Sequence, residues 1–288
     1  MIEKETSIDL SKFSTIKIGG IGKEIYFPKN PEEISYLIKK SLDENRKLIP
    51  IGIGSNLIFK DGILNHLFVS TKNLKKIQIE EKGEYVYITA EAGVSFKQIV
   101  ELVKKYNLEG FENLSGIPAS VGGAVAMNAG AFGTEIFDIL KEIHWINSEG
   151  RLIISKKGEI KHSYRYTQFQ KEGFVYKVTI VLKKSEKDIK QIIKNHLLER
   201  NKKQPLNLPT SGSTYKNPEK APAGYLLEKA GFKGKRIGDI GFSQKHANFL
   251  VNYGDATYSQ LIKLLRSAEN TVKTLFDVQL EREVKIVE

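Results

Sequence analysis

Cysteine is absent from the 288-residue sequence. Its absence excludes disulfides, thiolate metal sites, iron–sulfur clusters and a cysteine nucleophile. Long apolar runs are also missing, because no segment approaches the roughly 20 residues of a membrane span and the N-terminus lacks the apolar core of a signal peptide. We therefore expect a cytoplasmic protein that does not enter a membrane, and we expect no bound metal.

Acidic residues are fewer than basic ones, 34 against 45. The formal net charge is +11, and the lysines are spread along the chain instead of forming a basic tail. This charge favours anionic partners such as nucleic acid, phosphorylated cofactors or acidic substrates, although a generally lysine-rich surface explains it equally well. Basic residues are not interleaved with aromatic ones on one face, and no nucleic-acid-binding module is recognisable. We expect no nucleic-acid partner.

Helices and strands mix without a strict alternation. Four helix starts carry a capping residue followed three positions later by an acidic or amide residue, at Asn30, Ser95, Ser185 and Thr257. Strand patterns lie between them: "KEIYFP", "KLIPIGIG", "YVYITAEAG", "EIHWINSEGRLIIS", "FVYKVTIVLKK" and "VQLEREVKIV". "NSEG" is typical of a hairpin turn. The pattern predicts an α+β fold, which we divide into domains 1–72, 73–184 and 185–288.

A stretch without charge runs from Gly116 to Gly133, "GIPASVGGAVAMNAGAFG". Its glycines and alanines leave a surface made largely of backbone, which indicates positive φ angles or a neighbour pressed close to the chain. A flexible linker is the alternative, but linkers are rich in serine and charge, whereas this stretch contains Ile117, Val121 and Phe132. We favour a buried loop against a large flat ligand.

A second glycine-rich turn, "IGIGSNLIF", follows an apolar strand at Ile51–Phe59. It is not a dinucleotide-binding fingerprint, because Leu57 stands where the third glycine belongs and a strand-like "LIF" follows in place of a helix. It is not a P-loop either, since no Gly-Lys-Ser/Thr follows. A tight structural turn and a cradle of amides for an anion both remain open.

Three further segments carry polar residues with chemical potential. Arg165 lies between Tyr164 and Tyr166, and its guanidinium can fork onto a carboxylate or phosphate or simply stack on its neighbours at the surface. Ser213 follows a glycine in "PTSGSTYKNP", where the nucleophile-elbow pattern fails but a hydroxyl can still donate a proton. In "VQLEREVKIV" the glutamates lie opposite the apolar face, where solvated residues are the default.

Six segments, taken in order, resemble one family. They are "GIGSN", "GIPASVGGAVAMNAGAFG", "YRYTQF", "PTSGSTYKNP", "AGYLLEKAGFKGKRIGDIGFSQKHANFLVN" and "LEREVKIV". Together they resemble the UDP-N-acetylenolpyruvoylglucosamine reductases (MurB) of peptidoglycan synthesis. The resemblance implies a two-lobed FAD-binding domain of the vanillyl-alcohol-oxidase (PCMH) type, followed by a C-terminal α+β substrate-binding domain. The implied lobes are residues 1–72 and 73–184, and the substrate domain is 185–288.

The resemblance also implies roles for individual residues. Arg165 and a protonated Glu283 match groups that stabilise negative charge at the substrate carboxylate, and Ser213 matches the proton donor to C2, while the flavin N5 delivers hydride to C3. The residues matched to noncovalent FAD binding are Gly52, Ile53, Gly54, Ser55, Asn56, Gly116, Ile117, Pro118, Ser120, Gly122, Gly123, Asn128, Ala129 and Gly130. The residues matched to the UDP-sugar enolpyruvate or NADPH are Tyr164, Lys203 and Asn217.

The spacing from Arg165 to Ser213 leaves no room for the tyrosine loop of type I members, so the chain resembles type II. NADPH is the implied reductant, and it leaves before the substrate enters. We expect a monomer that makes UDP-N-acetylmuramate. Another noncovalent FAD oxidoreductase of the same fold is the alternative, and a nucleic-acid-binding protein is a second alternative that only the net charge supports.

Overall fold

The computed structural model describes all 288 residues. Contacts within the chain divide it into two compact units, each built from three segments. Unit 1 comprises Met1–Thr6, Glu24–Ile53 and Asn65–Leu198, and unit 2 comprises Ser7–Lys23, Gly54–Leu64 and Glu199–Glu288. The expected domains 1–72, 73–184 and 185–288 concern functional lobes and stay a prediction.

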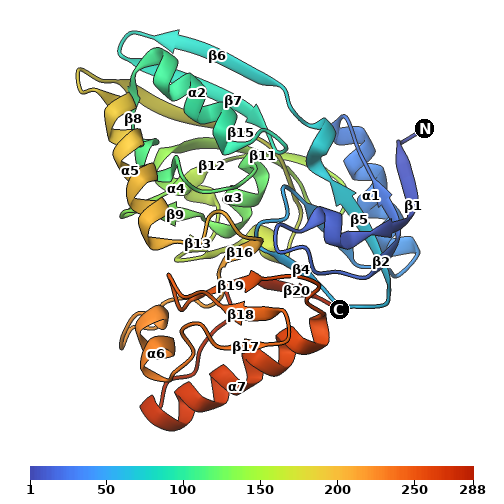
Figure 1. Cartoon of the computed structure of the whole chain (residues 1–288). Helices are drawn as coiled ribbons and strands as arrows, with labels where there is room; N and C mark the ends of the chain where they lie inside the picture. Colours follow the sequence, from blue (N-terminus) through green and yellow to red (C-terminus); the bar gives the residue numbers. More distant parts are fainter. The chain divides into compact units, whose positions relative to one another are not determined.

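Both helices and strands are distributed over the whole length (Figure 1). The α-helices are α1 Pro31–Asp43, α2 Phe96–Tyr106, α3 Val121–Met127, α4 Ile136–Ile139, α5 Ile189–Lys203, α6 Ala223–Lys229 and α7 Tyr258–Phe276. The first ten strands are β1 Lys4–Asp9, β2 Ile21–Tyr26, β3 Leu48–Ile51, β4 Leu57–Phe59, β5 Ile63–Ser70, β6 Ile77–Lys82, β7 Tyr85–Glu91, β8 Leu108–Glu109, β9 Gly130–Ala131 and β10 Thr134–Glu135. The others are β11 Leu140–Ile146, β12 Leu152–Lys156, β13 His162–Ser163, β14 Tyr166–Thr167, β15 Phe174–Lys184, β16 Thr210–Ser213, β17 Arg236–Ile237, β18 Ile240–Phe242, β19 Phe249–Asn252 and β20 Lys285–Val287.

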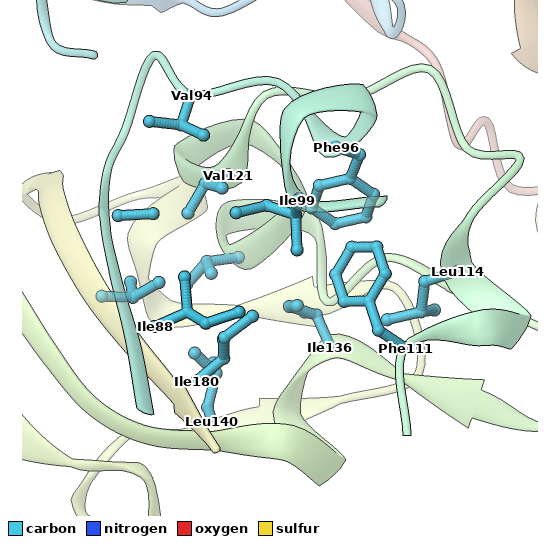
Figure 2. Close-up of a cluster of buried hydrophobic side chains, with 14 of the residues drawn as sticks. Ile88, Val94, Phe96, Ile99, Phe111, Leu114, Val121, Ile136, Leu140 and Ile180 are labelled. Carbon is cyan, nitrogen blue, oxygen red and sulfur yellow. The ribbon is translucent and has the colours of Figure 1, made fainter. Parts of the chain in front are cut away.

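A six-stranded antiparallel sheet is the centre of unit 1. Its strands follow the order β12-β11-β15-β7-β6, and β8 pairs with the far end of β15. The helix α3 packs on β15 and β7, which buries the small residues of this helix against the sheet. Ile88 and Ile180 of the sheet meet Ile99 of α2 and Val121 of α3 in the core that Figure 2 shows.

A second sheet of the chain has the order β1-β2-β5-β3, in which β3 and β5 run parallel. The helix α1 covers β3 and also contacts β11. Inside unit 1, Ile34 and Leu37 of α1 pack with Leu67 and Val69 of β5 in a separate small core. This smaller core also includes Ile146 of β11 and Phe174 of β15, so it is shared with the six-stranded sheet.

Unit 2 is built on a four-stranded antiparallel sheet with the order β16-β19-β18-β17. The long helix α7 lies along β17 and β18 (red in Figure 1), and its buried face includes Leu261, Leu264 and Leu265. The short strand β20 pairs in parallel with β4, so the end of the chain joins the segment 54–64 inside this unit.

Local sequence signals predicted several elements correctly. Asn30 caps α1 and accepts a hydrogen bond from the Glu33 amide, and complete capping boxes open α2 at Ser95 and α7 at Thr257. The hairpin turn at Asn147–Gly150 joins β11 to β12, and Asn147 accepts hydrogen bonds from two amides of the turn. These elements are fixed by interactions that span only a few residues, which is why their signals are legible in the sequence.

Two predicted elements were wrong in their bounds. The helix expected from Ser185 begins at Ile189, because Asp188 is the residue that accepts a hydrogen bond from the Gln191 amide, while Ser185 bonds to Asn107 and Glu109. The strand expected over 278–287 is only β20, Lys285–Val287. Its first part is held by irregular contacts, although Val278, Leu280 and Val284 are buried as the alternation predicted.

The six-stranded sheet provides a matched test of core packing. Ile88 on β7 is fully buried, whereas Ile154 on the edge strand β12 is 57% exposed. Ile88→Ala removes buried methyl groups and leaves a cavity, so we expect it to lower the free energy of unfolding by about 2–5 kcal/mol. Ile154→Ala creates no cavity and is expected to cost less than about 1 kcal/mol. Urea unfolding followed by fluorescence of the single tryptophan, Trp145 on β11 of the same sheet, measures both; equal losses would contradict this account.

Candidate active site

The uncharged stretch 116–133 contains the helix α3 and the strand β9, and is not the continuous loop that the sequence predicted. Ser120 caps α3, which ends at Asn128 in the left-handed conformation (φ 44°). The strands β9 and β10 follow as a short antiparallel pair. Small residues are needed because the helix lies close to the turn after β7: a Cβ on Gly122 would stand 2.6 Å from the Cβ of Ala92. Close packing within unit 1 therefore explains part of the glycine content without a ligand.

Two segments expected to bind the cofactor meet in unit 1. Gly52 follows β3, and a Cβ on it would lie 2.2 Å from the Oγ of Ser120, the residue that caps α3. Only a residue without a side chain permits this approach. The structure therefore brings the start of the glycine-rich turn at Ile51–Phe59 against the start of α3, although the two are far apart in the sequence.

Arg165 occupies the tip of the β13–β14 hairpin, with a left-handed backbone (φ 53°). Its Nη2 donates a hydrogen bond to the carbonyl oxygen of Gly130 (2.7 Å), and its Nη1 donates to that of Asn128 (3.4 Å). The guanidinium also lies over the ring of Tyr164, 4.9 Å from the ring centre. The hairpin is anchored on α3 through Thr167, whose hydroxyl donates to the carbonyl oxygen of Ala126.

Glu135 is a charged residue beside Arg165 that the sequence analysis missed. Its Oε2 accepts a hydrogen bond from the Nδ2 of Asn128 (2.6 Å), and its Oε1 lies 3.9 Å from the Nη1 of Arg165. Asn128 is completely buried, and its Oδ1 has no hydrogen-bond partner. The only sequence signal for Glu135 is that it is the first charge after the uncharged stretch.

In unit 2, Ser213 ends strand β16 opposite Phe249 of β19. The pairing of the two strands shifts register between Thr210 and Ser213, where Gly212 has a φ of +75°. The hydroxyl groups of Ser211 and Thr214, on either side, are buried without a hydrogen-bond partner. A bulge of this kind turns a side chain away from the regular alternation of a strand, and here it sets the direction of Ser213.

Asn248, a second residue that the sequence analysis missed, clamps the chain just after Ser213. Its side-chain amide donates to the carbonyl oxygen of Tyr215 (2.8 Å) and accepts from the amide of Tyr215 (2.9 Å). All of these groups are buried. The tyrosine ring is buried as well, and burial is the main cause that raises the pKa of its hydroxyl far above the ordinary value. The clamp fixes a backbone segment that would otherwise have a free edge.

Glu283 is tied to the same segment from the other side. Its amide donates to the carbonyl oxygen of Thr214 (2.8 Å), and Tyr215 forms an isolated bridge with Arg282. Arg282 is in turn held by two hydrogen bonds to Glu269 of α7. The carbonyl oxygen of Glu283 accepts from the Nδ2 of Asn56 (3.1 Å). Unit 2 therefore brings Ser213, Glu283 and Asn56 onto neighbouring backbone segments.

The predicted site residues are distributed over both units. Unit 1 contains Gly52, Ile53, Gly116, Ile117, Pro118, Ser120, Gly122, Gly123, Asn128, Ala129, Gly130, Tyr164 and Arg165, and unit 2 contains Gly54, Ser55, Asn56, Lys203, Ser213, Asn217 and Glu283. Lys203 is exposed at the end of α5 and pairs with Glu199, and Asn217 accepts a hydrogen bond from the amide of Ala223 at the start of α6. The amide of Thr15 donates to the carbonyl oxygen of Gly54.

Two family models match the chain. One is described as an FAD binding domain and matches residues 23–155, and the other is described as the C-terminal domain of UDP-N-acetylenolpyruvoylglucosamine reductase and matches residues 204–287. A curated UDP-N-acetylenolpyruvoylglucosamine reductase from Aquifex aeolicus is 45% identical over 283 residues, which cover 98% of this chain and 94% of the relative. The chain belongs to the UDP-N-acetylenolpyruvoylglucosamine reductase family.

Other members of the reductase family agree with this assignment. The relative from Clostridium tetani is 36% identical over 96% of this chain and 90% of its own length. A crystal structure of UDP-N-acetylenolpyruvylglucosamine reductase (MurB) from Thermus caldophilus matches with a TM-score of 0.83 and 26% identity, covering 100% of this chain and 99% of that one. The expected α+β fold, an FAD-binding domain followed by a C-terminal domain, is confirmed.

The residues of unit 1 fit an FAD group by their chemistry. The stretch 116–130 offers uncharged, partly accessible backbone, and the Oγ of Ser115 and the Oδ1 of Asn128 are buried near its two ends without hydrogen-bond partners. Buried polar atoms without partners are rare in proteins, and a polar ring system that binds here can satisfy them. No group of three or more acidic or histidine side chains is arranged to hold a metal ion. None of the helices is long and apolar enough to cross a lipid bilayer.

The clamp at Asn248 gives a testable prediction. Asn248→Ala leaves the buried amide and carbonyl of Tyr215 unpaired, so we expect the free energy of unfolding of unit 2 to fall by about 2–5 kcal/mol. Asn201→Ala, at an exposed position of the same unit, is the control and is expected to change it by less than about 0.5 kcal/mol. Urea unfolding followed by circular dichroism measures both, and an Asn248→Ala protein as stable as the control would refute the clamp.

Proposed function

We propose that this chain reduces the enolpyruvyl ether of UDP-N-acetylglucosamine enolpyruvate to UDP-N-acetylmuramate, with FAD as cofactor, NADPH as reductant and a monomer as the active form. The observation that carries the proposal is the arrangement of Ser213 and Glu283, which are distant in sequence but lie on backbone segments joined through Thr214. A reductive addition to an enol ether needs a proton donor and stabilisation of the charge that reaches the carboxylate. These two residues offer both within unit 2.

Ser213 is the proposed proton donor to C2 of the enolpyruvyl group. Its position on a bulged strand end, next to the backbone that Asn248 clamps, supports this role because a proton donor must be held in one direction. Glu283, in its protonated form, donates a hydrogen bond to the substrate carboxylate. Asn56 and Thr214 hold the backbone of Glu283 from both sides and limit its movement.

Arg165 is the proposed cationic partner of the substrate carboxylate. Two of its nitrogens already donate to the carbonyl oxygens of Gly130 and Asn128, so its guanidinium has a fixed plane. A fixed guanidinium loses little conformational entropy when a carboxylate binds, and its charge stabilises the electrons that move toward that carboxylate during hydride addition. Tyr164, on whose ring the guanidinium lies, together with Lys203 and Asn217, is proposed to contact the substrate or NADPH.

The backbone of residues 52–56 and 116–130 is proposed to hold FAD. Bound FAD would supply hydride chemistry there: hydride from NADPH would pass through the flavin to C3 of the enolpyruvyl group. The protein contributes amides and small side chains that permit close approach, and it keeps charged side chains out of this stretch. Asn128 and Ser115 are proposed to satisfy their unpartnered atoms on the cofactor.

A visible spectrum of the purified protein tests the proposal. We expect flavin absorption bands that bleach on addition of NADPH and return on anaerobic addition of UDP-N-acetylglucosamine enolpyruvate. Because the chain has no cysteine and binds the flavin without a covalent bond in this proposal, acid precipitation should release the yellow colour. A colourless protein, or a reduced flavin that the substrate does not reoxidise, would exclude this function; colour retained in the pellet would indicate another flavoenzyme of this fold.

Ser213→Ala separates the two half-reactions. We expect flavin reduction by NADPH to change by less than about threefold, while reoxidation by the enolpyruvyl substrate slows by roughly 10²–10⁴-fold, since only the second step needs the proton donor. Ser211→Ala, two residues earlier on the same strand, is the matched control and is expected to leave both rates unchanged. Stopped-flow absorbance of the flavin gives both rates, and equal losses in the two steps would assign Ser213 a structural role.

A further inference from the structure

Three residues of unit 1 form a closed network around the guanidinium of Arg165. Glu135 accepts from the side-chain amide of Asn128 with one carboxylate oxygen and faces Arg165 with the other, at 2.6 and 3.9 Å. Asn128 closes the ring, because its backbone carbonyl accepts from the Nη1 of Arg165 (3.4 Å). The three come from separate elements: the end of α3, the start of α4 and the tip of the β13–β14 hairpin.

The network restricts the movement of two side chains, those of Asn128 and Arg165, which differ in burial. The side chain of Asn128 has its Nδ2 shared between Glu135 and the carbonyl oxygen of Ser163, which leaves its Oδ1 buried and without a partner. The side chain of Arg165 is 17% exposed, and that of Glu135 is 33% exposed. A mostly buried cation is better tolerated beside a carboxylate, and a flexible arginine is directed best when several acceptors surround it.

We propose that Glu135 is the positioning residue for Arg165 in the proposed reduction, acting through the ring that it forms with Asn128. This inference rests on the proposed function. Glu135 holds the guanidinium against the carbonyl oxygens of Asn128 and Gly130, so that the plane of the guanidinium keeps one direction when the substrate carboxylate binds. Glu135 does not touch the substrate itself. The same ring couples the direction of Arg165 to Asn128, whose unpartnered oxygen we assign to the cofactor.

Two effects of removing the charge of Glu135 oppose each other. Without it, Arg165 loses a competing anion, which favours binding of the substrate carboxylate. That gain is small, because a partly exposed ion pair at 3.9 Å contributes little. The loss of direction is larger, since a misplacement of about 1 Å at a reacting group can slow a reaction about 100-fold. The net effect is therefore a slower reaction with the substrate.

Glu135→Gln removes the charge and retains the shape of the side chain. The backbone roles of Glu135, the pairing with Gly130 and the hydrogen bond from its amide to Asp138, do not depend on the charge. The matched control is Glu149→Gln, which breaks the exposed pair between Glu149 and Arg151 in the same unit. Both proteins are studied as the FAD-loaded full chain.

Stopped-flow measurements of the two half-reactions give the first readout. We expect Glu135→Gln to slow flavin reoxidation by the enolpyruvyl substrate by roughly 10- to 100-fold and to change reduction by NADPH by less than about threefold. Glu149→Gln should change neither.

A double variant tests whether Glu135 acts through Arg165. When Glu135→Gln is combined with Arg165→Lys, the double variant should be no more than about twofold slower than Arg165→Lys alone, because a residue that acts through Arg165 has nothing left to position. Additive losses, or a Glu135→Gln protein as fast as the control, would overturn the proposal.

Nuclear magnetic resonance of the arginine side chains gives a second readout that needs no substrate. The Nε–H and Nη–H signals of Arg165 are assigned by their loss in Arg165→Lys. We expect separate Nη signals in the wild type, where acceptors hinder rotation of the guanidinium, and averaged signals in Glu135→Gln. Unchanged signals would overturn the positioning role. A wild type that the substrate does not reoxidise would instead exclude the proposed function, and the two failures are thus distinguishable.

If Glu135→Gln does not fold, Glu135→Asp carries the same test. It keeps the charge but shortens the side chain by one methylene, which lengthens its contacts with Asn128 and Arg165. We expect slower reoxidation than in the wild type, unchanged reduction by NADPH and faster guanidinium rotation. A protein with wild-type rates and wild-type signals would refute the proposal.

Discussion

Close packing against two glycines in unit 1 is the constraint on which the arrangement around α3 depends. Gly52 lies against Ser120, and Gly122 lies against Ala92, at distances that no side chain permits. These contacts fix where α3 begins, and the helix ends at Asn128, which has a left-handed backbone. Because Asn128 and Gly130 provide the carbonyl oxygens that bind Arg165, the packing of glycines at one end of the helix determines the direction of a cation at the other.

In unit 2, a backbone segment near the proposed site is fixed by other contacts than in unit 1. The segment after Ser213 has no helix to hold it, and it is fixed instead by backbone pairing with residues 281–284 and by the side chain of Asn248. The pair between Arg282 and Glu269 ties this arrangement to α7. In both units, a short polar side chain in a buried position orients a backbone segment that carries a residue of the proposed mechanism.

The sequence was sufficient for the fold class, three of the four helix caps and the family. Caps and hairpin turns depend on neighbours in the chain, and the family depends on motifs that are continuous in sequence. The role of the glycines was harder to predict, because Gly122 is required by Ala92, a residue whose proximity only the folded sheet reveals. Glu135 and Asn248 were missed for the same reason: a lone glutamate or asparagine has no pattern, and its partners come from other elements.

The shift of α5 to Ile189 and the shortening of the last strand have a related cause. Ser185 and Asp188 both offer a side-chain oxygen to the start of a helix, but Ser185 is already engaged by Asn107 and Glu109, which leaves Asp188 as the cap. Over 278–284 the apolar alternation is that of a strand, but the neighbouring segment at 214–216 bonds only at intervals. In both cases, contacts with distant parts of the chain decided between local structures that the sequence favoured almost equally.

The left-handed backbone of Arg165 has a cost in conformational energy. A non-glycine residue in this conformation is strained by the order of 1 kcal/mol, and glycine or asparagine adopts it more readily. A glycine or an asparagine at the hairpin tip would therefore be expected to relieve this strain. The hairpin tip therefore carries a strained residue in order to place a cation there. The contacts among Arg165, Glu135 and Asn128 offset part of that strain in a hairpin of only two paired positions.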